Sequence, residues 1–128
     1  MMVRPVSRLR FGMIAAMADP AQIRRHSTIV KSLTAEYFAS GRMHSMPADE
    51  LLAIRTTVVR SLRFLDPLVR KAPRSRAVSL LGKPYGEWGR DSLLYPGPAS
   101  NQFYRVDLVD GVVRRTGFVT ILDAEYGK

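Results

Sequence analysis

The chain has 128 residues, 46% of them hydrophobic, and no cysteine. A chain of this length folds as one domain that buries roughly two-thirds of its unfolded surface, so no disulfide framework is needed. The absence of cysteine excludes disulfides, thiolate metal sites, thiol nucleophiles and lipid anchors attached to cysteine. The net charge of +9 belongs to the N-terminal part: residues 1–90 carry sixteen basic and six acidic side chains, whereas residues 91–128 carry four and five.

Residues 1–18 form a basic and apolar leader, in which three arginines precede an apolar run over residues 11–18. This order imitates a secretory signal, but the run is short for a signal core and far below the roughly 20 residues of a membrane span. We predict a disordered leader and favour a cytoplasmic protein. A secreted or periplasmic protein is the alternative if the leader acts as a signal peptide, and Met13 or Met17 is an alternative translation start.

An amphipathic helix is predicted from Pro20 to Ser40, because apolar residues recur along it at helical spacing. Asp19 can cap free backbone N–H groups, and proline suits the first helical position, where no donor is needed. Gly41 can adopt the left-handed conformation that ends a helix.

The clearest period in the chain predicts a second helix over residues 47–71. Six apolar residues, three or four positions apart, share one side of it: Leu51, Ile54, Val58, Leu62, Leu65 and Val69. Asp66-Pro67 interrupts the helix, and because Val69 keeps the phase of the stripe, we predict a kink or a restart capped by Asp66. If the helix is continuous, a basic face lies away from the stripe, made of Arg60, Arg63, Arg70, Lys71 and Arg74.

A short third helix is predicted over residues 75–81, with Ser75 as its cap and Gly82 as its end. A turn-rich loop follows, rich in glycine and aromatic residues. It leads into a strand at about residues 92–95. The next three residues, Pro-Gly-Pro, are too rich in proline for a ladder strand and form a connection.

A hairpin is predicted from strands at residues 103–109 and 112–121, because Asp110-Gly111 suits a two-residue turn between antiparallel strands. That turn sets the expected partners across the hairpin, which are Val109 with Val112, Asp107 with Arg114, and Arg105 with Thr116. Gly117 is predicted to mark a bulge.

Catalytic and metal chemistry find little support in the residue pattern. The two histidines, His26 and His44, lie eighteen residues apart and no acid stands at a recognisable ligand spacing, so no metal site or cofactor is expected. No serine stands in a nucleophile-elbow context, and the glycines lack a phosphate-loop order. His26 falls between turns of the apolar stripe, which favours a boundary position over a catalytic one.

Two binding hypotheses remain. The first is a non-enzymatic protein-interaction module that contacts another protein through the sheet and the Tyr85–Tyr95 loop, with Tyr85, Trp88 and Tyr95 as contact residues. The alternative is a nucleic-acid-binding protein that uses the basic face of the second helix. The aromatic residues lie in the near-neutral part of the chain, away from the basic face, which counts against binding of single-stranded nucleic acid.

Residues 75–121 resemble the small outer-membrane lipoprotein (SmpA/OmlA-like) family and its relatives of the β-lactamase-inhibitory-protein type. The resemblance lies in the order Ser-Leu-Leu-Gly-Lys-Pro (79–84), a Gly-rich loop, Leu-Leu-Tyr (93–95) and the hairpin around Asp110-Gly111. It implies two helices packed on a small antiparallel sheet, used for protein binding without catalysis. The chain departs from that family by lacking a lipidated cysteine near its start and by its longer second helix, so the family's membrane anchor and its role in outer-membrane assembly do not transfer.

The sequence therefore predicts an α+β fold, with two to three helices packed on one face of a small antiparallel meander sheet of about three strands. The domain spans residues 19–122, and residues 123–128 form a frayed tail. One core is expected to unite Leu51, Ile54, Val58, Leu62, Leu65, Tyr104, Val106 and Leu108.

Overall fold

The structure is a computed structural model that describes residues 19–121, so the predicted leader and tail lie outside the described residues. The helical elements come first in the chain: α2 (Pro20–Leu33), the π-helix η1 (Thr34–Ala39), the 3₁₀-helix η2 (Arg42–Ser45), α3 (Ala48–Val69) and α4 (Arg74–Leu81). The strands follow: β1 (Gly86–Trp88), β2 (Ser92–Pro96), β3 (Gln102–Val109) and β4 (Val112–Thr120). Within residues 19–121, no helix is both long and apolar enough to cross a membrane.

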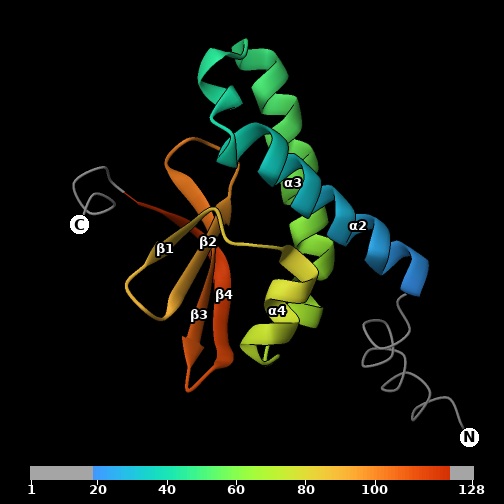
Figure 1. Ribbon diagram of the computed structural model, residues 1–128, viewed down its shortest axis with the longest axis vertical. Coiled ribbons are helices and arrows are strands. Elements are labelled where there is room, and N and C mark those ends of the chain that lie inside the picture. Colours follow the sequence, from blue (N-terminus) through green and yellow to red (C-terminus); the bar gives the residue numbers. More distant parts are fainter. Residues whose placement is uncertain (1–18, 122–128) are drawn as a thin grey trace, which may run out of the picture.

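The strands form one antiparallel meander in the order β1-β2-β3-β4, and the three α-helices lie together on one side of it (Figure 1). The α+β class is therefore as predicted, but the described sheet has four strands where about three were expected. The additional strand is β1, which holds only three residues, begins at a glycine and lies in the segment predicted to be a turn-rich loop. Pairing with β2 makes it a strand, and such tertiary pairing overrides local propensity.

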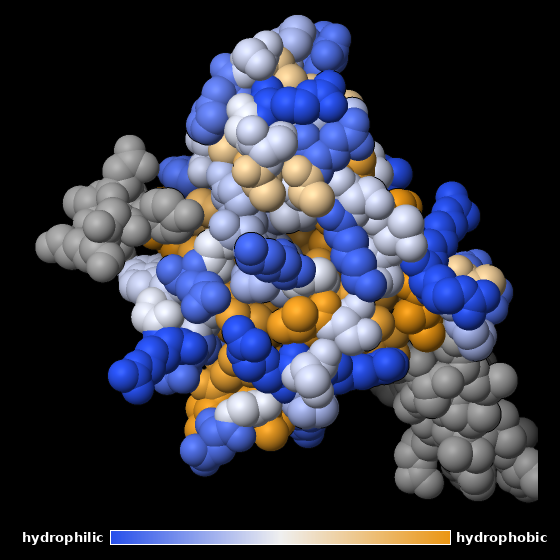
Figure 2. Space-filling model, viewed as in Figure 1, coloured by the Kyte–Doolittle hydropathy of each residue, from blue (hydrophilic) through white to orange (hydrophobic). Residues whose placement is uncertain are grey.

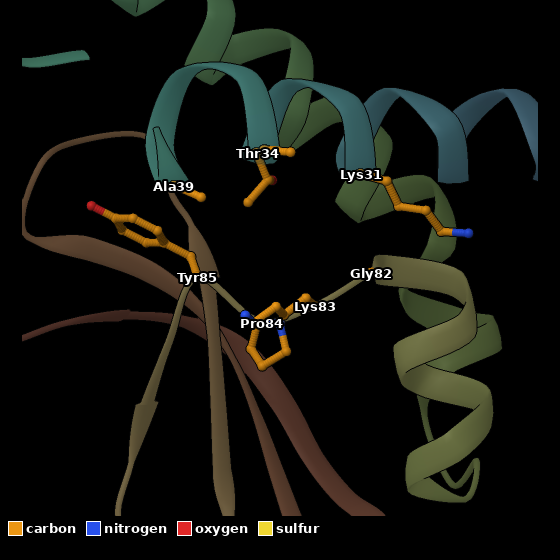
Figure 3. A pocket seen from close by; sticks show the side chains of 8 residues that line it. Lys31, Thr34, Ala39, Gly82, Lys83, Pro84 and Tyr85 are labelled. Atoms are coloured by element: carbon orange, nitrogen blue, oxygen red, sulfur yellow. The ribbon is translucent and has the colours of Figure 1, made fainter. Parts of the chain in front are cut away.

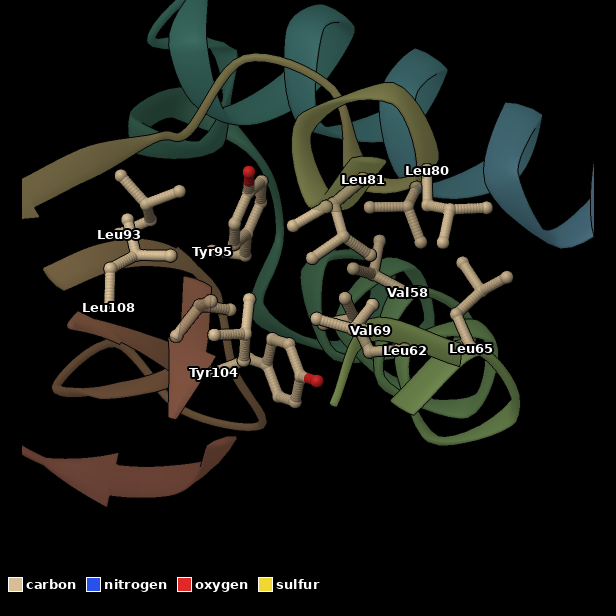
Figure 4. Packing of buried hydrophobic residues seen from close by; sticks show 14 residues of the cluster. Val58, Leu62, Leu65, Val69, Leu80, Leu81, Leu93, Tyr95, Tyr104 and Leu108 are labelled. Atoms are coloured by element: carbon tan, nitrogen blue, oxygen red, sulfur yellow. The ribbon is translucent and has the colours of Figure 1, made fainter. Parts of the chain in front are cut away.

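The main core lies between the helices and the inner face of the sheet (Figure 4). Six of the eight predicted core residues are buried there: Val58, Leu62, Leu65, Tyr104, Val106 and Leu108. Ile54 is only partly buried and Leu51 is half-buried. The first turns of α3 extend past the end of the sheet in Figure 1, so the apolar stripe of that helix continues beyond the surface that would cover it.

The first helix is α-helical only up to Leu33. Asp19 caps it by accepting a hydrogen bond from the Ala21 N–H at 3.0 Å, with Pro20 in the first turn. The next six residues form the wider π-helix η1, a change of helical period that the apolar pattern does not predict. Gly41 follows with φ of +84°, the left-handed conformation that glycine adopts without a steric penalty.

The second helix passes through Pro67 and ends at Val69. Asp66 does not cap a restart there, because its carboxylate instead accepts hydrogen bonds from Tyr104 and Thr116 of the sheet. The chain turns at Lys71, which has φ of +66°, and the short helix α4 then begins at Arg74. Ser75 lies inside α4 and gives no side-chain cap, which corrects the predicted start of that helix.

A bulge changes the register of the β3–β4 hairpin. Val109 pairs with Val112 as predicted, but the register shifts between Asp107 and Leu108, so Asp107 faces Arg115. The predicted pairs of Asp107 with Arg114 and of Arg105 with Thr116 are therefore wrong, and Arg105 faces Gly117. Side chains alternate between the two faces of a strand, so a β4 strand without the bulge would turn Arg115 toward the core. The extra residue keeps both Arg114 and Arg115 outside the core.

Candidate functional site

The sheet has a second face, turned away from the helices, which we call the outer face. Strand alternation assigns to it Trp88, Ser92, Leu94, Phe103, Arg105, Asp107, Arg115 and Val119. Its apolar part is a small cluster in which Leu94, Phe103 and Ile121 are buried and Trp88 and Val119 are partly buried. The remainder is charged, so the outer face joins an aromatic region to an ion-pair network.

Asp107 is the centre of that network. Its Oδ1 accepts hydrogen bonds from Ser92 Oγ at 2.6 Å and Arg105 Nε at 2.7 Å, and its Oδ2 accepts from Arg115 Nε at 3.1 Å. Burial alone would raise the pKa of Asp107, but the three donated hydrogen bonds outweigh it and hold the pKa below its ordinary value. One carboxylate thus fixes two guanidinium groups on the outer face.

Trp88 and Arg105 connect the charged part to the aromatic part. The Arg105 guanidinium carbon lies 4.8 Å from the centroid of the Trp88 ring, which is a cation–π contact. Since Arg105 is also bound to Asp107, the position of the indole is fixed through two successive contacts. Beside this cluster the surface has two shallow hollows of about 380 and 320 Å³, both lined by Arg105, Asp107 and Arg115.

The three predicted contact residues have different surroundings. Trp88 is half-buried on the outer face, as described above. Tyr95 is fully buried in the main core and donates a hydrogen bond from its hydroxyl to the Gly82 carbonyl oxygen at 2.8 Å, so its prediction as a surface contact is corrected. Tyr85 is half-buried, with its ring against Phe38 at 5.9 Å and Phe103 at 6.3 Å between centroids.

The predicted basic face is divided among three elements. Arg60 and Arg63 lie on α3, Arg70 and Lys71 in the connection after it, and Arg74 at the start of α4. Two of the five already have partners: Arg63 lies over the Phe118 ring at 5.1 Å, and Arg70 pairs with Asp66 at 2.9 Å. A single ridge on one continuous helix is therefore not present.

Arg55 is a structural residue that the sequence does not reveal. It lies on α3 with only 7% of its surface exposed, and its Nη1 donates to the carbonyl oxygens of Gly97 at 3.0 Å and Ala99 at 3.1 Å. Its guanidinium also covers the Phe38 ring at 5.0 Å. Arg55 directly follows Ile54 of the apolar stripe of α3. A position next to the stripe does not by itself predict that the side chain is buried.

His26 has a structural environment. Its Nδ1 lies 2.8 Å from Ser61 Oγ and its ring stacks on Phe64 at 4.2 Å. Burial, followed by repulsion from Arg25, lowers its pKa. Ser61 is only 1% exposed, so this serine and histidine do not form a dyad that a substrate can reach. In the part of the chain that the structure describes, no cluster of three or more His, Cys, Asp or Glu side chains could hold a metal ion.

The chain matches no protein-family model, no curated protein and no solved structure.

Proposed function

We propose that this protein is a non-enzymatic protein-interaction module whose contact surface is the outer face of the sheet. The observation that carries the proposal is the cluster of Trp88, Arg105, Asp107 and Arg115, held in place by mutual contacts on the face without helices. Tryptophan and arginine are the side chains that most often dominate the binding energy of protein interfaces. Fixing them before binding reduces the entropy that association costs.

The charge of the cluster indicates the chemistry of the partner. Two guanidinium groups share one carboxylate, and the Arg115 side chain is 75% exposed whereas that of Asp107 is 17% exposed. A partner that brings a carboxylate to Arg115 and an apolar side chain to Trp88 would complement both halves of the surface. The resemblance of residues 75–121 to a family of protein-binding modules with helices on an antiparallel sheet supports the same function.

Affinity capture from the native host tests the proposal. Tagged wild-type protein is compared with Trp88→Ala and Arg115→Glu on the outer face, and with Arg60→Glu on α3 as a charge-matched control. We expect proteins that the wild type enriches to be lost with both outer-face variants and retained by the control. If all variants capture the same proteins to the same extent while keeping the wild-type circular dichroism spectrum, the outer face is not the contact surface.

A second candidate, nucleic-acid binding, is favoured by one observation. Residues 60–76 carry six basic side chains against one acid, Asp66, which is already paired with Arg70. The exposed and unshared charges among them are Arg60, Lys71, Arg74 and Arg76. Clustered cations bind the phosphate backbone without sequence preference by releasing its counterions.

A salt titration distinguishes the two candidates. If the basic residues bind phosphates, affinity for a short DNA duplex falls steeply between about 50 and 200 mM salt, and each removed contact lowers the logarithmic slope by roughly 0.9. The double variant Lys71→Gln, Arg74→Gln would then lower the slope by about twice that amount, because two phosphate contacts are removed. Arg115→Gln would leave the slope unchanged. Absence of retention on DNA or heparin at 50 mM salt would reject this candidate.

A further inference from the structure

A pocket of about 440 Å³ lies between the first helix and the segment that links α4 to β1 (Figure 3). Thr34 lines it from η1, Lys31 from α2, and Lys83 and Tyr85 from the linking segment. In Figure 3, Lys31 and Tyr85 stand at opposite ends and Thr34 lies between them. The volume falls within the range of roughly 300–1,000 Å³ typical of small-molecule sites.

The backbone on both sides of the pocket is irregular. The helix changes to the π form at Thr34, and π-helical turns occur frequently at functional sites. Opposite it, Gly82 has φ of +86°, and a Cβ at that position would lie 2.8 Å from the Cγ of Lys31. A side chain at residue 82 would therefore fill the edge of the pocket against the stem of Lys31.

Thr34 has a hydroxyl group without a partner. The residue is only 4% exposed, and within residues 19–121 its Oγ1 is the one buried side-chain polar atom that makes no hydrogen bond. On α3, Thr56 and Thr57 instead donate to carbonyl oxygens four residues earlier, at 2.8 and 2.9 Å. Leaving a buried hydroxyl unpaired destabilises a protein by roughly 1–3 kcal/mol, so a ligand that supplies the partner removes that penalty. Thr34 lines the pocket, so this hydroxyl is the unpaired polar group of its wall.

The charge and the walls of the pocket define the kind of ligand. Lys31 and Lys83 are exposed, and neither is in an ion pair with a described carboxylate. Ala35, Ala39 and the Tyr85 ring supply apolar surface to the same pocket. We propose that this pocket binds a small organic anion, whose charged head group lies near the lysines and the Thr34 hydroxyl and whose flat apolar body lies against Tyr85.

Titrations of the full chain with four probes test the proposal, using ¹H–¹⁵N chemical shifts at constant ionic strength. Benzoate and phenyl phosphate carry both an apolar ring and an anionic head, benzyl alcohol carries only the ring, and inorganic phosphate only the charge. We expect saturable shifts at the amides of residues 31–39 and 82–85 with at least one of the first two. Benzyl alcohol and inorganic phosphate should bind at least about tenfold more weakly, the loss expected when a charged hydrogen-bonding head group or the apolar contact is missing. Comparison of benzoate with phenyl phosphate distinguishes a carboxylate from a phosphate head group.

Substitutions distinguish a specific binding site from general attraction of anions to positive charge. Thr34→Val keeps the shape of the side chain and removes the unpaired hydroxyl. It should therefore raise the melting temperature or leave it unchanged, while lowering the affinity for the anion about fivefold or more. Lys83→Gln should weaken binding as well, and Lys71→Gln, a lysine outside the pocket, should not. The proposal is overturned if none of the probes gives saturable shifts at these amides, or if Thr34→Val and Lys83→Gln bind with wild-type affinity.

Discussion

Arg55 shows how one buried cation can be held without an acid. It makes no ion pair with a described carboxylate, and its charge is instead directed at two backbone carbonyl groups of the β2–β3 connection and at the Phe38 ring. Burial lowers its pKa, yet an arginine remains protonated at every pH at which the protein is folded. Arg55 therefore fixes the Pro-Gly-Pro connection to α3.

Replacing Arg55 should show the size of this contribution. Arg55→Met keeps much of the apolar stem but leaves the Gly97 and Ala99 carbonyl groups without their donor, so we expect a loss of about 3 kcal/mol in the free energy of unfolding. Arg60→Met, an exposed arginine on the same helix, should change it by no more than about 0.5 kcal/mol. Urea unfolding of the two variants makes the comparison, and equal losses would contradict the role of Arg55.

Asp107 gives the outer face a dependence on pH. Its folded-state pKa lies below the value of about 3.9 in an unfolded chain. Between the two values the unfolded chain binds a proton that the folded protein does not, so stability from this group is present above about pH 4 and lost as the pH falls through the folded pKa.

Asp107→Asn tests that assignment. The variant should be less stable than the wild type at pH 6, and the difference should shrink as the pH falls below about 4, because only the wild type loses the charged acceptor. Urea midpoints measured from pH 6 to pH 2.5 provide the test, and the other carboxylates act equally in both proteins. A difference that stays constant across that range would show that the charge of Asp107 is not involved.

At the scale of elements, Asp66 joins α3 to the sheet. Its Oδ1 accepts from the Tyr104 hydroxyl at 2.5 Å and the Thr116 hydroxyl at 2.6 Å, and its Oδ2 pairs with Arg70 at 2.9 Å. Burial and then the hydrogen bond to Asp66 raise the pKa of Tyr104, so the phenol stays neutral and donates. The last turn of α3 is thereby fixed to strands β3 and β4 despite the proline at residue 67.

Asp66→Ala should lower the free energy of unfolding by about 3 kcal/mol, because two hydroxyl groups and a guanidinium lose a charged partner. Tyr104→Phe should cost about 1 kcal/mol, since Thr116 and Arg70 still satisfy the carboxylate. A double-mutant cycle between the two positions measures their coupling, which we expect to be about 1 kcal/mol. Additive effects would mean that the hydrogen bond contributes nothing beyond its two separate side chains.

Two glycines in the sheet region have opposite requirements. A Cβ on Gly97 would lie 2.4 Å from the Gln102 carbonyl oxygen and 2.8 Å from the Phe103 nitrogen, and both of these are backbone atoms that cannot easily move. A Cβ on Gly117 would meet no atom within 4 Å. The close approach at Gly97 keeps the β2–β3 connection tight, whereas Gly117, predicted to mark a bulge, lies in regular pairing opposite Arg105.

Alanine at the two positions should therefore act in opposite directions. Gly97→Ala should destabilise the protein by about 2 kcal/mol or more, because the overlap is with backbone. Gly117→Ala should stabilise it by about 0.5 kcal/mol, since alanine loses less conformational entropy in a strand. Thermal and urea unfolding of both variants measure these changes in stability. A Gly97→Ala variant as stable as the wild type would contradict the close approach.

The sequence predicted elements better than contacts. The α3 stripe and the Asp110-Gly111 turn follow from local periodicity and turn chemistry, which need only neighbouring residues. The bulge opposite Asp107, the strand β1 and the burial of Tyr95 depend on partners far along the chain, so no local pattern contains them. For the same reason Trp88 could be proposed as a contact residue, whereas its partner Arg105 could not.

At the scale of the whole molecule, the two faces of the sheet differ. The helices cover one face of the sheet and leave the outer face to its own side chains (Figure 1). Figure 2 shows the side that carries α2 and α4, where hydrophilic side chains dominate and hydrophobic surface appears mainly in the lower half, toward the β3–β4 turn. Val109 and Val112 at that turn are 52% and 44% exposed. The turn therefore adds apolar surface at one end of the outer face.

The most direct test of protein binding through the outer face is site-specific photo-cross-linking in the native host. A benzophenone amino acid replaces Arg114, which lines one of the hollows of the outer face, or Arg60 on α3, both of them exposed. Binding through the outer face predicts discrete protein adducts from residue 114 that disappear when Trp88→Ala is added, and few or none from residue 60. Adducts of equal yield from both positions, or from residue 60 alone, would contradict it.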